Sequence, residues 1–292
     1  MLALERGDGT MTPWLLGGVA AYAIAVGGLW LAQDGLVFPT AATVRRGDEP
    51  PPRAAVARTL RTPDGETVQG WLMRRERSRG LVLGFQGNAW HGDDFFNFLA
   101  HRLPDHDVAV FHYRGYAPST GRPSEAALVA DAVLIHDRLR EELRPERVLA
   151  AGFSLGSGVA AQLAAQRSID GALLVTPFDS IEAIARTRYP WVPVRRLLAH
   201  PFRSDLALRG RELPVAVIAA GADRVVPPER TRSLEAGLAR LVFSHTLADA
   251  SHQDLYDRAE FQSVLERAID SLHRARAAEL NVEVLSDERP RS

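Results

Sequence analysis

The segment that decides the fold runs from residue 148 to residue 158 and reads Val-Leu-Ala-Ala-Gly-Phe-Ser-Leu-Gly-Ser-Gly. Its first residues predict a buried strand, and the small residues after Gly156 predict a helix. A G-x-S-x-G pattern at such a junction is typical of a nucleophile elbow, a sharp turn that holds the serine in a strained conformation. Neighbours two positions from Ser154 must be small, which accounts for Gly152 and Gly156, and Gly158 is expected to relieve the same crowding. We therefore predict that Ser154 is a nucleophile.

Strand-like and helical patterns alternate on both sides of this segment. Pro63-Asp64-Gly65 predicts a turn between two strand-like runs, at 56–62 and 66–74. Six continuous apolar runs follow, at Leu81–Phe85, Val108–His112, Val148–Gly152, Ala172–Val175, Val215–Ala219 and Phe243–Leu247. Helical stretches include Glu125–Leu143, Gly156–Arg167, Glu229–Arg240 and the closing Phe261–Ala277. This alternation predicts the α/β class, with a mostly parallel central sheet, helices on both faces and an antiparallel hairpin leading into it.

Two further residues are expected beside Ser154. A serine hydroxyl needs a base to accept its proton and an acid to orient that base. When an elbow carries the serine, the acid and the histidine follow it in that order. Asp223 follows the strand at 215–219, and His252 follows the last strand. Because parallel strands end at one edge of the sheet, we expect Ser154, Asp223 and His252 to converge there.

Other residues suit these roles less well. Asp179 is the alternative acid, whereas Asp249 and Asp254 lie too close to His252 in sequence. Three other histidines are expected on helix or loop surfaces: His101, His106 and His136. The remaining five precede the serine or lie in an insert, a strand or the closing helix: His91, His112, His200, His245 and His273.

A tetrahedral intermediate needs hydrogen-bond donors already in place for its oxyanion. The amide of Leu155, next to the nucleophile, is the first expected donor. The second is the amide of Asn88, in the loop Gln86-Gly87-Asn88-Ala89, where Gly87 permits close backbone approach. This chemistry requires neither a metal nor an organic cofactor.

The segment from Trp14 to Ala32 holds nineteen residues without a charge. As a helix it would span roughly 28 Å, close to the ~30 Å hydrocarbon core of a bilayer. Tryptophans near both ends favour the membrane interface, and the segment is longer than the apolar stretch of about 7–15 residues that is usual in a signal peptide. We predict a transmembrane anchor; a cleaved signal peptide and a buried core helix are the alternatives. The side of the membrane stays open, because large domains cross with little regard to flanking arginines.

Composition sets further limits on the 292-residue chain. The absence of cysteine excludes disulfides, thiolate metal sites and a cysteine nucleophile, and a net charge of −1 gives no nucleic-acid footprint. The oligomeric state is left open. The predicted organisation is an N-terminal tail at 1–13, the anchor at 14–32, a linker at 33–53, a catalytic domain at 54–277 and a polar tail at 278–292.

These pieces, in this order, resemble the membrane-anchored α/β-hydrolase-domain serine hydrolases, within the wider serine aminopeptidase S33-like superfamily. That family includes lysophospholipid-cleaving and protein-depalmitoylating members. The resemblance extends from Leu36 to Tyr256. It is carried by Asp34–Pro39, Gly87-Asn88-Ala89, Tyr113-Arg114-Gly115-Tyr116, Gly152–Gly156, Thr176-Pro177-Phe178, Tyr189-Pro190, Gly221–Pro227 and Ser251-His252. It implies an α/β-hydrolase fold with Ser154, Asp223 and His252 as the triad and the Asn88 and Leu155 amides as the oxyanion hole.

Two departures stand out against this family. Gln86 replaces a histidine in the oxyanion loop, and His112 replaces an acidic residue before Tyr-Arg-Gly. We expect altered loop hydrogen bonding from the first and loss of any contact of that acid from the second. Arg114 is expected to brace the loop rather than to bind substrate. The segment 178–211 lies where this fold carries a short lid, whose apolar residues either accept an acyl chain or pack onto the sheet.

The expected activity is hydrolysis of carboxylic ester or thioester bonds in a small-molecule or lipid-like acyl substrate, of the EC 3.1 type. A peptidase or acylaminoacyl hydrolase on the same triad is one alternative. A catalytically idle, membrane-tethered interaction protein is the other.

Overall fold

An eight-stranded sheet forms the centre of the structure, a computed structural model that describes residues 11–43, 45 and 49–287. The strand order is β1-β2-β4-β3-β5-β6-β7-β8, with β1 and β2 antiparallel to their neighbours and all other pairs parallel. The strands are β1 Ala55–Arg61, β2 Thr67–Met73, β3 Leu81–Phe85, β4 Asp107–Phe111, β5 Val148–Phe153, β6 Gly171–Val175, β7 Val215–Ala220 and β8 Leu241–Leu247. The predicted mixed sheet, with its antiparallel entry hairpin, is confirmed.

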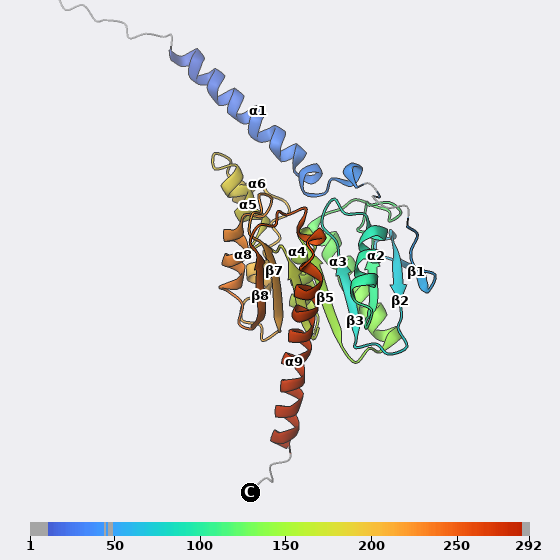
Figure 1. The fold of residues 1–292 in the computed structure, drawn as a ribbon. Coiled ribbons are helices and arrows are strands. Elements are labelled where there is room, and N and C mark those ends of the chain that lie inside the picture. The colour runs from blue at the N-terminus through green and yellow to red at the C-terminus, as the bar shows by residue number, and fades with distance from the viewer. Residues whose placement is uncertain (1–10, 44, 46–48, 288–292) are drawn as a thin grey trace, which may run out of the picture.

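Helices cover both faces of this sheet (Figure 1). One face packs α2 (Gly92–Arg102) and α9 (Phe261–Asp287); the other packs α3 (Glu125–Leu143), α4 (Leu155–Gln166), α7 (Ser204–Leu208) and α8 (Pro228–Glu235). Successive residues of a strand point to opposite faces, so Leu83 joins the core beneath α3 and α4 while Val82 joins the core beneath α2 and α9. Burial on both faces explains why the parallel strands read as continuous apolar runs.

Three helices end five or more residues away from their predicted ends. Helix α8 stops at Glu235, five residues early, because Gly237 follows closely. Helix α9 continues ten residues past its predicted end, since residues 278–287 contain neither glycine nor proline. Helix α1 (Met11–Val37) extends beyond the predicted anchor to just before Pro39, which cannot continue a helix. The predicted tails up to residue 10 and from residue 288 lie outside the described residues.

Helix α1 projects from the end of the molecule that carries the lid helices, while α9 ends on the opposite side (Figure 1). The lid contains α5 (Ile181–Arg188) and α6 (Val194–Leu197), and two short 3-10 turns lie at Thr40–Ala42 and Leu255–Asp257. Within α1, residues 14–37 are long and apolar enough to cross a membrane, and none of that window is buried in the protein. The alternative of a buried core helix is therefore wrong.

A buried histidine pair joins α9 to the sheet on the side away from α1. His106 Nε2 lies 2.9 Å from His273 Nε2, and Arg147 Nη1 lies 2.9 Å from His273 Nδ1. A guanidinium can only donate, so His273 accepts at Nδ1 and donates from Nε2 to His106. Burial is the main cause that lowers the pKa of each histidine to about 4, so both are neutral near pH 7.

This pair predicts instability in mild acid. Both histidines have an ordinary pKa of 6.5, so between pH 6.5 and 4 the unfolded chain binds more protons than the folded chain. Their contribution to stability is complete above pH 6.5 and falls as pH is lowered. Urea unfolding of the full chain in detergent at pH 7.5 and pH 5 should show a larger loss for the wild type than for His106→Gln. The exposed His101→Gln serves as control; equal losses in wild type and His106→Gln would contradict the interpretation.

Candidate active site

Ser154 occupies the sharp turn between β5 and α4. Its φ of 51° lies in a region that L-residues rarely adopt, which costs about 1–3 kcal/mol. A Cβ on Gly152 would lie 2.3 Å from the carbonyl oxygen of Gly156, and a Cβ on Gly156 would lie 1.9 Å from that of Phe85. The steric explanation for both glycines is confirmed.

The prediction for Gly158 was wrong. A Cβ there would lie 2.9 Å from the ring of Phe202 and 3.1 Å from that of Phe178. These two aromatic side chains come from the lid segment and from the residues that follow β6. The glycine therefore makes room for packing against α4 and takes no part in the turn.

The side chains of Ser154, Asp223 and His252 meet at the carboxyl edge of the sheet. His252 Nε2 lies 2.9 Å from Ser154 Oγ, and His252 Nδ1 lies 2.7 Å from Asp223 Oδ2. The other carboxylate oxygen of buried Asp223 accepts the backbone N–H groups of Val225 and Val226, each at 2.8 Å. The Asp223 carboxylate is placed to accept an Nδ1–H group of His252. In that tautomer, the unprotonated Nε2 of His252 faces the serine hydroxyl.

The alternative acid and two of the other histidines have different partners. Asp179 pairs with Arg230 at 3.1 Å and accepts the amide N–H of Ser180. His106 and His136 are not on the surface as predicted: both are buried, and His136 contacts Asp137 through Nδ1 at 2.9 Å. Local sequence does not reveal such burial, because it depends on distant elements packing over the ring.

The loop after β3 passes over the serine. A Cβ on Gly87 would be 3.6 Å from the Cβ of Ser154, an ordinary contact, so space alone does not require glycine there. The side-chain amide of Asn88 donates to the carbonyl of Val37 at the end of α1, at 3.3 Å. Leu155 is the first residue of α4, where backbone N–H groups have no partner within the helix. Both predicted oxyanion donors thus belong to segments bordering Ser154.

Comparison with known proteins identifies the fold family. The family model of the alpha/beta hydrolase fold matches residues 80–213. An uncharacterized protein of Mycobacterium tuberculosis is 35% identical over 219 residues, covering 72% of this chain and 77% of that protein. The chain belongs to the α/β-hydrolase family.

Other relatives of this α/β hydrolase carry more informative names. An uncharacterized membrane protein of Saccharomyces cerevisiae is 31% identical over 233 residues, 75% of this chain and 82% of that protein. A lysophosphatidylserine lipase of Danio rerio is 28% identical over 173 residues, 52% of this chain and 45% of the lipase. A crystal structure of an alpha-beta hydrolase from Vibrio vulnificus superposes with a TM-score of 0.63 at 17% identity, covering 83% of this chain and 92% of that one.

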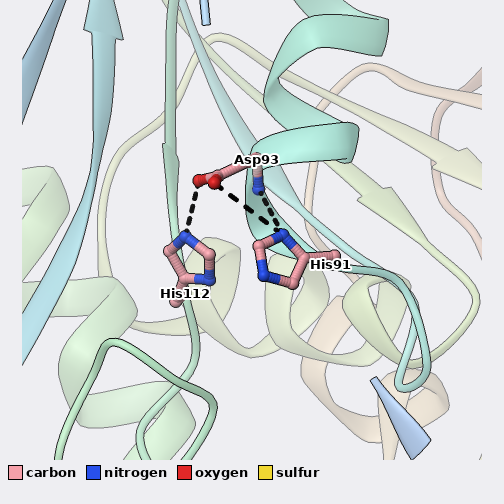
Figure 2. Close-up of side chains that lie close together, drawn as sticks. All are labelled: His91, Asp93 and His112. Atoms are coloured by element: carbon pink, nitrogen blue, oxygen red, sulfur yellow. Dashed lines mark hydrogen bonds and ion pairs between the residues drawn. The ribbon is translucent and has the colours of Figure 1, made fainter. Parts of the chain in front are cut away.

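Beside the loop after β3, His91, Asp93 and His112 lie close together (Figure 2). Their potential ligand atoms are within 4.8 Å of one another, the one such group of three among the residues that the structure describes. However, one oxygen of Asp93 is already close to the indole N–H of Trp71 (2.7 Å) and to His112 Nε2 (2.9 Å). The other faces Arg45 Nη1 at 3.8 Å. These contacts suit a hydrogen-bonded brace better than a cation site.

Asp93 also places an acidic group beside His112, the residue that replaces an acid of the family before Tyr-Arg-Gly. Burial raises the pKa of Asp93, but the hydrogen bonds from His112 and Trp71 outweigh this effect and lower the pKa to about 2. A carboxylate therefore still lies at this edge, supplied by α2 instead of the residue before Tyr-Arg-Gly. Sequence reasoning missed Asp93, whose only local signal is its place in the first turn of a helix.

Arg114 holds the neighbouring loop to α3. It donates to both oxygens of buried Asp131, at 2.6 and 3.1 Å, and also pairs with Asp64 in the entry hairpin. A buried bidentate pair of this kind fixes orientation as well as contributing energy. The bracing role predicted for Arg114 agrees with these contacts.

Asp93→Asn should lower the free energy of unfolding by about 1–3 kcal/mol, because it removes the charge that strengthens both buried hydrogen bonds. Asp270→Asn, which breaks the exposed pair with Arg79, should cost at most about 1 kcal/mol. The melting temperature of the wild type should not change in EDTA or with added Zn²⁺. A fall in EDTA would mean that these residues hold a metal.

Proposed function

We propose that this α/β hydrolase cleaves carboxylic ester or thioester bonds of lipid-like acyl substrates through an acyl-enzyme on Ser154. The observation that carries the proposal is the hydrogen-bonded series from Asp223 through His252 to Ser154, with distances of 2.7 and 2.9 Å. Each of the three residues follows a different parallel strand, so the sheet supports all of them at one edge.

In the proposed reaction, His252 Nε2 accepts the hydroxyl proton as Ser154 Oγ attacks the acyl carbonyl. The resulting oxyanion takes hydrogen bonds from the backbone amides of Leu155 and Asn88. Collapse breaks the bond to the alcohol or thiol, which leaves with the proton from His252. Water then attacks the acyl-enzyme by the same steps and releases the carboxylic acid. Asp223 stays ionised and stabilises the imidazolium that forms twice per cycle.

The proposal that the substrates are lipid-like rests on observations outside the Ser154 site. A relative is named as a lysophosphatidylserine lipase, and the lid of this chain presents apolar residues next to a helix long enough to span a bilayer. Amide hydrolysis on the same triad is the rival reaction, and a panel of p-nitrophenyl esters, acyl thioesters and aminoacyl amides separates the two.

Ser154→Ala should abolish labelling by a fluorophosphonate probe and lower kcat for p-nitrophenyl butyrate to near background, since loss of such a nucleophile costs about 10⁶ in a related mechanism. Ser263→Ala, on the outer face of α9, is the matched control and should label like the wild type. Labelling that persists in Ser154→Ala would remove this serine from its role. A folded wild type that neither labels nor turns over any ester would favour the idle interaction protein.

We also propose that α1 anchors the hydrolase in a membrane, as the name of the yeast relative and the apolar exposed surface of the helix suggest. The expressed chain should stay with the membrane pellet in alkaline carbonate and should retain residues 14–32 by mass spectrometry. Recovery of a soluble chain lacking these residues would identify the segment as a cleaved signal peptide instead.

A further inference from the structure

One face of α1 lies against the protein and the others do not. Val26, Leu29, Gln33 and Val37 are partly buried and recur at intervals of three and four residues, which places them on a single stripe of the helix. In contrast, Leu31 is 76% exposed. The stripe shows that α1 packs on the enzyme along a defined line.

Polar contacts fix the lid to this part of α1. Tyr22 donates to the carbonyl of Trp191 at 2.9 Å, and their rings meet edge to face with centroids 6.1 Å apart. The Gln33 side chain donates to the carbonyl of Leu197 at 3.3 Å and accepts the amide N–H of Ala199 at 2.7 Å. A glutamine that uses both ends of its amide on one loop sets both the position and the rotation of the helix.

A cavity of about 450 Å³ lies between α1 and the lid. Its walls are mostly apolar, with Val26 and Leu29 on the helix side and Ile184 and Val192 on the lid side. The volume falls in the range of about 300–1,000 Å³ that is usual for small-molecule sites.

Two residues that line the cavity are hydrogen-bonded to residues of the proposed site. Val225 lines it, and the amide of Val225 donates to Asp223 Oδ1. Val37 also lines it, and the carbonyl of Val37 accepts the Asn88 side chain of the oxyanion loop. A chain occupying this space would therefore have one end beside the acid and the oxyanion loop of the proposed site.

We propose that this cavity holds the acyl chain of the substrate and that α1 is one of its walls, so that the membrane helix helps to set chain-length preference. The inference rests on the proposed function and deepens it. The occupant is a single acyl chain, because the walls are mostly apolar, with Arg188 and Arg224 among the lining residues, and the cavity lies between a bilayer-length helix and the lid. In this proposal the chain extends along α1, and its carbonyl end leaves the cavity beside Val37 and Val225 toward Ser154.

The test fills the cavity from the helix side. Full-length wild type, Leu29→Trp and Val26→Trp are reconstituted in phosphatidylcholine vesicles, with Leu31→Trp as the matched control on the exposed face. The measured quantity is the ratio of kcat/KM for p-nitrophenyl palmitate to that for p-nitrophenyl butyrate. The ratio should fall at least tenfold in Leu29→Trp and Val26→Trp and stay within twofold of wild type in Leu31→Trp. An unchanged ratio in both cavity variants, or an equal fall in Leu31→Trp, would overturn the inference.

A binding measurement separates this inference from the proposed function. Radiolabelled palmitate should bind Ser154→Ala protein, and adding Leu29→Trp to that protein should weaken binding at least tenfold, whereas adding Leu31→Trp should not. If the binding pattern is as expected but the wild type cleaves no ester, the proposed function is wrong and the assignment of the cavity to an acyl chain still holds. Equal binding by the two double variants would defeat the cavity alone.

Discussion

The close approach of α4 to β3 is the constraint on which the site depends. The helix can begin directly after Ser154 only because position 156 has no side chain where it touches the carbonyl of Phe85. Phe85 is the last residue of β3 and leads straight into the loop that carries Asn88. One backbone contact therefore sets the distance between the serine turn and the loop that passes over it. A side chain at position 156 would push α4 away from β3 and so separate the serine turn from the loop that carries Asn88.

Support for the rest of the site comes from the sheet. The order of the parallel strands reverses between β3 and β5, since β4 lies on one side and β6 on the other. In α/β sheets, ligands bind beyond the carboxyl ends of the strands at such a point, and Ser154 and Asn88 follow the two strands concerned. Asp223 reaches the same edge from β7, where two backbone amides hold its carboxylate. The backbone thus fixes the carboxylate of Asp223, which in turn contacts His252.

Sequence patterns predicted most strands and the whole of α3, because burial on both faces leaves an unmistakable apolar run. They also placed Ser154, Asp223 and His252 at the ends of the right strands, though their catalytic roles remain predictions. They failed where partners are remote in sequence. The sequence around His106 and His136 gives no sign that both side chains are buried, His106 in contact with His273 of α9. The pairing of Asp93 with His112 joins two elements that share no local signal.

The sequence pattern could not reveal the stripe on α1, for a different reason. When nearly every residue of a helix is apolar, periodicity cannot distinguish a side that faces lipid from a side that faces protein. Only Gln33 interrupts the apolar pattern of that stripe, and its meaning depends on the lid carbonyl and amide that it meets.

Helix α1 meets the globular body directly at its C-terminal end. The helix continues to Val37, whose carbonyl accepts the side-chain amide of Asn88, and Phe38 is buried in the core one residue later. A spanning helix responds to a thinner or thicker bilayer by changing its tilt. If α1 spans a bilayer as proposed, a change in its tilt would act on the lid through Gln33 and on the loop beside Ser154 through Val37. Bilayer thickness would then affect the geometry around Ser154.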